Sequence, residues 1–143
     1  MITFGEELMP IAYFPSLANA EVVEVAFAAT TGGDLNLRLL VDFGFTGSSW
    51  FVLSRHLVNI AMSPAPAVHA FGAIHGIQQR VTVFCRIPAI SYQARGVAIV
   101  TDLGPMGLPS GVDGTVSLRF LRQFRRWGSE KLDDGSWQFF LET

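Results

Sequence analysis

The chain has 143 residues, of which 50% are apolar and 15% are charged, a composition typical of a globular domain with a dense core. The formal net charge of −2 gives no electrostatic reason to expect nucleic-acid binding, and the longest apolar runs are far shorter than the roughly 20 residues of a membrane span. We therefore expect one domain over residues 1–143 that binds neither nucleic acid nor membrane. The N-terminus lacks the basic region of a secretory signal, and a single cysteine, Cys85, rules out an internal disulfide, so we expect a cytoplasmic location.

Strand signals recur along the first half of the chain. Runs of β-branched and alternating residues predict strands over residues 21–27 and 35–41, with a turn over 30–34 between them. The second strand becomes fully apolar at its end, so we expect it to enter the core and to stop at Asp42. A short buried strand is expected over 50–53, followed by a turn of helix over 55–60 that Ser54 would cap.

The second half of the chain is also mostly strand. Residues 68–83 predict a hairpin with glycines on both sides of an apolar tip, and residues 87–92 and 93–100 predict another strand pair. Leu118, Leu121 and Phe124, spaced by three, predict a single short helix over 115–124. Asp133-Asp134-Gly135 predicts a turn before a terminal strand over 137–141. The expected fold class is therefore all-β.

A single carboxylate directly follows the second predicted strand. Asp42 comes after Leu39-Leu40-Val41, and a chain reversal built from Gly44 and Gly47 comes next. A buried carboxylate costs several kcal/mol unless it is paired or hydrogen-bonded, so this position indicates chemistry. Asp42-Phe43-Gly44 also matches the metal-binding triplet of kinases, but the chain has no His-Arg-Asp catalytic loop, which excludes that class.

The stretch from Asp42 to Gly47 resembles the active-site loop of the retropepsin-like aspartic proteases. That family carries Asp-Thr/Ser-Gly, then a small or apolar residue, then Ser or Thr; here Asp42, Gly44 and Thr46 match, and Phe43 does not. Phe45-Thr46-Gly47 resembles a variant of the loop in bacterial and archaeal members. A second signature, a hydrophobic pair and a glycine that lead into a helix, is resembled by residues 111–121. Three residues depart from it: Thr115, Ser117 and Arg119 stand where the family has an aliphatic residue, a glycine, and Asp or Asn.

The resemblance covers about residues 21–141 and implies a closed retropepsin-like barrel after an N-terminal segment, residues 1–20. It implies a catalytic Asp42 in an active-site loop made of Phe43, Gly44, Phe45, Thr46 and Gly47. It also implies a flap that closes over bound peptide, made of Phe71, Gly72, Ala73, Ile74, His75 and Gly76. An aspartic protease needs two carboxylates that share a proton, and this chain has one such loop, so the implied enzyme is a symmetric homodimer that hydrolyses peptide bonds.

The departures leave a second hypothesis open, in which an inactive dimer of this fold binds peptides or proteins. Phe43 cannot make the hydrogen bond that the family hydroxyl makes between subunits, but its ring can pack against its symmetry mate or a strand below. No cofactor is expected, and His56, His69 and His75 lack metal-ligand spacing, so no metal site is expected. Ser48 and Ser49 match no nucleophile elbow, and we expect them to bond to loop amides.

Overall fold

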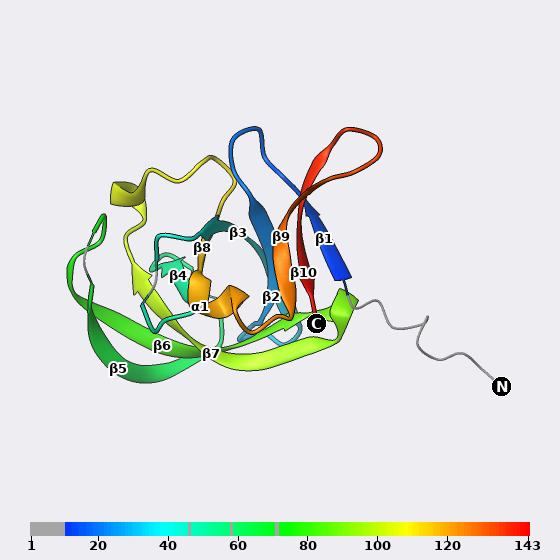
Figure 1. Cartoon of the computed structure of the whole chain (residues 1–143). Helices are drawn as coiled ribbons and strands as arrows, with labels where there is room; N and C mark the ends of the chain where they lie inside the picture. Colours follow the sequence, from blue (N-terminus) through cyan, green and yellow to red (C-terminus); the bar gives the residue numbers. More distant parts are fainter. Residues whose placement is uncertain (1–10, 46, 58, 71) are drawn as a thin grey trace.

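The chain folds into a closed barrel with a smaller sheet beside it (Figure 1). The structure is a computed structural model that describes residues 11–45, 47–57, 59–70 and 72–143. One sheet contains β2 (Val22–Ala28), β3 (Asp34–Asp42), β4 (Phe51–Ser54), β5 (Met62–Ala70), β6 (Gly76–Ile87), β7 (Tyr92–Thr101) and β8 (Gly114–Ser117). The other contains β1 (Ile11–Pro15), β9 (Arg126–Lys131) and β10 (Trp137–Glu142).

The barrel closes because β2 pairs with strands on both sides. The strand order is β2-β3-β8-β4-β7-β6, and β2 pairs again with β6 at Ala26 and Phe27, while β5 adds to the far edge of β6. Closure leaves most of the backbone groups of these strands paired within the sheet. The predicted all-β class, with a closed barrel and one short helix towards the C-terminus, is confirmed.

The centre of the sheet brings the ends of β3 and β8 together. These two strands run parallel, in a register that places Asp42 opposite Ser117, and β8 pairs on its other side with β4. Gly114 begins β8 at a point where a Cβ atom would lie 2.2 Å from the backbone oxygen of Val52. Only glycine fits there without moving the strand, so the close approach that positions the two signature motifs depends on it.

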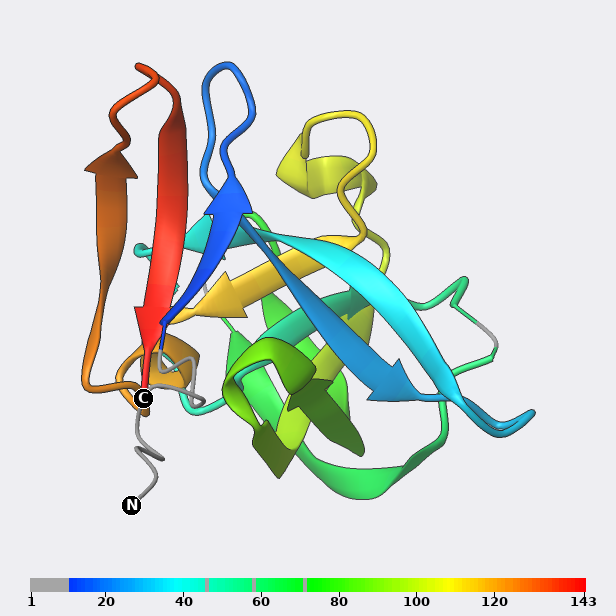
Figure 2. The same cartoon turned by 90° about the vertical axis from the view of Figure 1, so that its right-hand side faces the viewer.

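The three-stranded sheet stands beside the barrel and shares its core (Figure 2). Its strand order is β1-β10-β9, all antiparallel, and β1 lies within the segment 1–20 that was expected to precede the barrel. Phe14, Phe139 and Leu141 from this sheet pack into the same apolar cluster as Phe27 and Phe51 of the barrel. Each such side chain contributes roughly 1.5–3 kcal/mol when fully buried, so the small sheet is a structural part of the barrel's core.

The helix is shorter than predicted. Residues 114–117 form β8, and only Leu118–Leu121 form α1. Thr115 and Val116 are β-branched and pair with strands on both sides, and this pairing overrides the apolar spacing that favoured a helix from residue 115. Within the described part of the chain, no helix has the length and apolar character needed to cross a bilayer.

Two other local predictions are wrong. The described residues of 55–60 form a turn and a bridge, not a helix, and Ser54 Oγ accepts a hydrogen bond from the His56 N–H over 3.1 Å. The strand predicted over 87–92 is replaced by a 3-10 turn, η2 (Pro88–Ile90), between β6 and β7. Pro88 has no N–H to donate to a strand ladder, so the chain turns there.

Candidate active site

Asp42 is the last residue of β3, where the loop to β4 begins. Its Oδ1 accepts a hydrogen bond from the Gly44 N–H over 3.1 Å, and its backbone carbonyl accepts one from the Phe45 N–H over 3.2 Å. The side chain is half-buried. The loop therefore turns tightly around the carboxylate and gives it a backbone donor without removing it from solvent.

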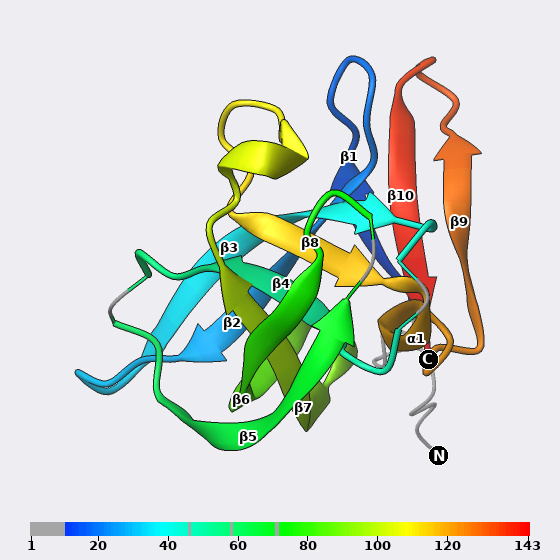
Figure 3. The ribbon, with the colours of Figure 1, turned by 90° about the vertical axis from the view of Figure 1, so that its left-hand side faces the viewer.

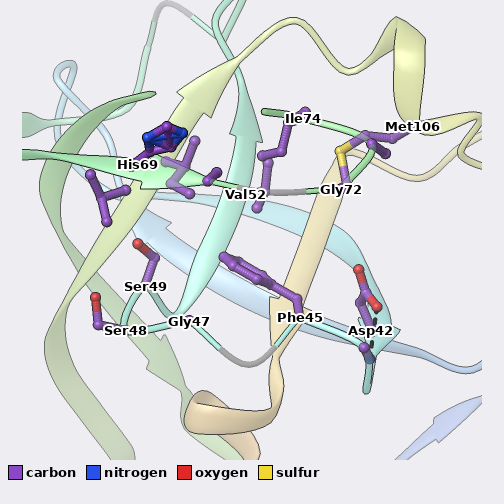
Figure 4. Close-up of a pocket in the computed structure, with 15 residues that line it drawn as sticks. Asp42, Phe45, Gly47, Ser48, Ser49, Val52, His69, Gly72, Ile74 and Met106 are labelled. Atoms are coloured by element: carbon purple, nitrogen blue, oxygen red, sulfur yellow. Dashed lines mark hydrogen bonds between the residues drawn. The ribbon is translucent and has the colours of Figure 1, made fainter. Parts of the chain in front are cut away.

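A cleft of about 470 Å³ lies between this loop and the β5–β6 hairpin. Figure 3 views the face where the hairpin and the loop both lie, and Figure 4 shows the residues that line the cleft. The loop contributes Asp42, Gly44, Phe45, Gly47, Ser48 and Ser49. The hairpin contributes Val68, His69, Ala70, Gly72, Ala73 and Ile74, and β4 and β7 contribute Val52 and Ile99. Met106, from the 3-10 turn η3 (Gly104–Met106), completes the lining. The volume and the mixed lining suit part of an extended peptide.

Most of the predicted loop and hairpin residues line this cleft, but not all of them. Phe43, His75 and Gly76 are not part of the lining: His75 is exposed, and Gly76 starts β6 with a φ of +92°. Thr46 and Phe71 lie outside the described residues. The structure therefore brings the Asp42 carboxylate and the predicted flap residues Gly72, Ala73 and Ile74 to one cleft.

Phe43, the main departure from the family loop, points away from the cleft. Its ring stacks on Trp127 of β9 at a centroid distance of 5.7 Å, and Phe139 of β10 lies 6.4 Å away. Trp127 and Phe139 belong to the small sheet of the same chain, so packing on a strand, one of the two arrangements that the sequence suggested, is present. Phe43 therefore packs the start of the loop against that sheet.

The second signature meets the loop through two backbone hydrogen bonds, and a serine side chain caps its helix. Ser117 is fully buried; its N–H donates to the Trp50 carbonyl over 2.9 Å, and its Oγ accepts from the Phe120 N–H over 3.3 Å. It is thus the N-cap of α1. The next amide, Leu118 N–H, donates to the Phe45 carbonyl over 3.2 Å. The start of the helix therefore supports the Asp42 loop from below.

Among the described residues, the two serines of the loop bond to an arginine and not, as predicted, to loop amides. Arg80 of β6 donates from Nη1 to Ser48 Oγ over 3.0 Å and to Ser49 Oγ over 3.4 Å, and from Nε to the Pro66 carbonyl over 2.6 Å. One guanidinium thus joins the Asp42 loop to both strands of the hairpin. Arg80 is 31 or 32 positions from these serines in sequence, so no local pattern pointed to it.

Cys85 lies in the barrel wall, away from the cleft. Its side chain is fully buried and donates weakly to the Ala94 carbonyl over 3.4 Å, and burial raises the pKa of its thiol to about 12. A thiol in this state is a small hydrophobic side chain and not a nucleophile.

Comparison of the chain with protein-family models and with curated protein sequences found no match. Among solved structures, the chain is similar to "EIAV protease complexed with the inhibitor HBY-793", with 14% sequence identity and a TM-score of 0.41. The alignment covers 75% of this chain and 89% of that one. At this level of similarity the match gives no information about activity.

Proposed function

We propose that this chain is a retropepsin-like aspartic endopeptidase with a bacterial-type variant of the active-site loop, which works as a symmetric homodimer. The observation that carries the proposal is the position of Asp42, at the end of β3 on a cleft that the β5–β6 hairpin borders. The supporting contacts are the Gly44 N–H that donates to its carboxylate and the Leu118 N–H that supports the loop.

In the proposed reaction two Asp42 side chains, one from each subunit, share a proton across the two-fold axis. The charged carboxylate takes a proton from water as the water oxygen bonds to the scissile carbonyl carbon, and the protonated one donates to the carbonyl oxygen. When the tetrahedral intermediate collapses, the C–N bond breaks and the amine nitrogen takes the proton that the first carboxylate received from water. One hydroxyl of the intermediate returns its proton to the second carboxylate as the product carboxyl group forms. Two carboxylates this close repel each other when both are charged, so the pair would hold one proton between them.

The peptide would lie in the cleft as an extended strand. The apolar residues of the lining, among them Val52, Ile74 and Ile99, would contact alternate side chains, and the hairpin would close over the chain. Because its one cysteine is buried and needs no oxidising partner, we propose that the protein works in a reducing compartment such as the cytoplasm.

The proposal is tested by peptide-library cleavage with the wild type and Asp42→Asn. Asparagine keeps the shape of the side chain and accepts the Gly44 hydrogen bond, but it cannot take a proton from water. We expect cleavage by the wild type and a loss of at least about a hundredfold in the variant. Equal inactivity of the two proteins from acid to neutral pH would refute the enzyme.

The second candidate is a peptide-binding dimer of the same fold without catalysis, and the packing of Phe43 favours it. A ring held by Trp127 supplies no hydroxyl to stiffen the contact between two Asp42 loops. Substituting Phe43→Thr separates the candidates by activity. Cleavage that appears only in this variant would identify the natural chain as the binding module, whereas activity that is unchanged or reduced would show that the enzyme tolerates Phe43.

A further inference from the structure

The cleft has a polar end that is separate from Asp42. In Figure 4, Ser48 and Ser49 lie on the opposite side of the cleft from Asp42, with the Phe45 ring between them. Both serines line the cleft, and Ser49 is only 1% exposed. Behind them Arg80 donates to both hydroxyl oxygens and to the Pro66 carbonyl.

These contacts decide whether each serine hydroxyl can still donate or accept a hydrogen bond. A guanidinium has only donors, so each serine oxygen accepts from Arg80 and keeps its own O–H to donate elsewhere. Among the described residues, neither Ser48 nor Ser49 has an acceptor for that proton. Ser48 is exposed and can donate to water, but Ser49 is buried, and a buried donor without an acceptor costs roughly 1–3 kcal/mol. The Ser49 hydroxyl therefore favours a ligand with acceptor oxygens at this end of the cleft.

The positive charge of Arg80 also favours a ligand with acceptor oxygens at this end of the cleft. Arg80 is half-buried, and none of the ion pairs found within residues 11–45, 47–57, 59–70 and 72–143 includes it. The three atoms that accept from it are neutral oxygens, so its positive charge remains uncompensated by these contacts. A charge partly removed from water is screened less than one at the surface, so it attracts an anion and repels a cation.

We infer that Ser48 and Ser49, backed by Arg80, form a subsite for an acidic side chain, Asp or Glu, of the bound peptide. This inference rests on the proposed binding of an extended peptide in the cleft. A carboxylate accepts from both hydroxyls and is attracted by the guanidinium. A Lys or Arg side chain would present donors to donors and meet a like charge, and a Leu side chain would leave the hydroxyl protons unpaired.

The test uses fluorescein-labelled ten-residue peptides that are identical except at one position, which carries Glu, Gln, Leu or Lys and is moved along the peptide. Binding is measured by anisotropy with the Asp42→Asn protein, and cleavage with Asp42 intact. At one peptide position we expect Glu to be preferred over Leu by roughly tenfold or more, and Lys to be the weakest, because hydrogen bonds to charged groups are strong. The Glu-to-Leu ratio does not depend on the fraction of folded protein.

Three substitutions connect that ratio to the subsite. Arg80→Met should reduce the Glu preference to roughly threefold or less, because methionine removes the charge that attracts the Glu carboxylate. Arg80→Gln keeps an amide donor for the serines but removes the charge, so it should abolish the discrimination between Glu and Gln even if Arg80→Met fails to fold. Arg95→Met removes an exposed arginine from β7 as the matched control, and it should leave the ratio unchanged.

The outcomes separate this inference from the proposed function. Cleavage without any Glu preference, or a preference that survives both substitutions of Arg80, would overturn the subsite and leave the enzyme intact. Binding with a Glu preference that depends on Arg80, but without cleavage, would support the subsite and refute the enzyme. No binding of any peptide would overturn both.

Discussion

Phe43 offers the sharpest test of how the Asp42 loop is held, because its contacts lie within one chain. The ring is 48% exposed and stacks on Trp127 at 5.7 Å, with an interplanar angle of 28°. The Phe139 ring centroid lies 6.4 Å from that of Phe43. Replacing Phe43 by Thr removes the ring and leaves the backbone of the loop free to adopt the same turn.

The size of the effect follows from these contacts. Full burial of a phenylalanine contributes roughly 1.5–3 kcal/mol, and a ring about half exposed gains about 1 kcal/mol. An aromatic pair adds about 0.5–1.5 kcal/mol. We therefore expect Phe43→Thr to lower the free energy of unfolding by about 2 kcal/mol, which for a chain of this length is a fall in Tm of about 4–8 °C.

The assay is thermal and urea unfolding followed by circular dichroism, with Tyr13→Thr as the matched control. Tyr13 is 42% exposed and contacts Phe140 at 6.2 Å, so its loss should cost a similar amount of stability. Neither ring lines the Asp42 cleft, but Phe43 directly follows Asp42 in the loop whereas Tyr13 lies in β1, so only the Phe43 substitution should alter peptide cleavage or binding.

An unchanged Tm for Phe43→Thr, together with a lowered Tm for Tyr13→Thr, would contradict this reasoning. It would mean that the stack on Trp127 adds nothing to the folded state. The small sheet would then not hold the loop, and another contact would have to explain its position.

Three further predictions follow from buried groups and from the proposed mechanism. Thr115→Val should raise the free energy of unfolding by about 1 kcal/mol in urea titrations, because the Thr115 hydroxyl is buried without a hydrogen-bond partner among the described residues, and a loss of stability would contradict this. Cys85 should not react with a thiol reagent at pH 8 until the protein unfolds, because burial raises the pKa of its thiol to about 12. For the same reason, the contribution of Cys85 to stability should be complete below about pH 9 and decline as the pH rises towards 12. Light scattering at micromolar concentration should give twice the mass of one chain, and a stable monomer would remove the second Asp42 that the mechanism needs.

The sequence predicted those parts of the fold that depend on local patterns. The alternation of β3 and its apolar end placed Asp42 at a strand terminus, and the glycines at both ends of the hairpin tip placed the turn between β5 and β6. The tight turn after Asp42 followed from Gly44, whose amide bonds to the carboxylate. In each case the signal and its consequence lie within a few residues of one another.

The parts that were missed depend on pairing between distant segments. Thr115 and Val116 have helix-like neighbours in sequence, but β3 and β4 pair on both sides of them and make them a strand. Arg80 resembles any other polar residue of an alternating strand, and its role emerges only when β6 is placed beside the loop. The packing of Phe43 likewise depends on Trp127, a residue that is distant from it in sequence.

The two principal departures from the family motifs have partners within this chain. Phe43 packs on Trp127, and Ser117 caps α1, so both residues stabilise the fold that carries the loop. Neither contact involves the Asp42 carboxylate, which accepts a hydrogen bond from the Gly44 N–H. The departures therefore change how the loop is anchored and leave the carboxylate available at the cleft. What separates an enzyme from a binding module is then whether a second subunit places another Asp42 within hydrogen-bonding reach of the same water.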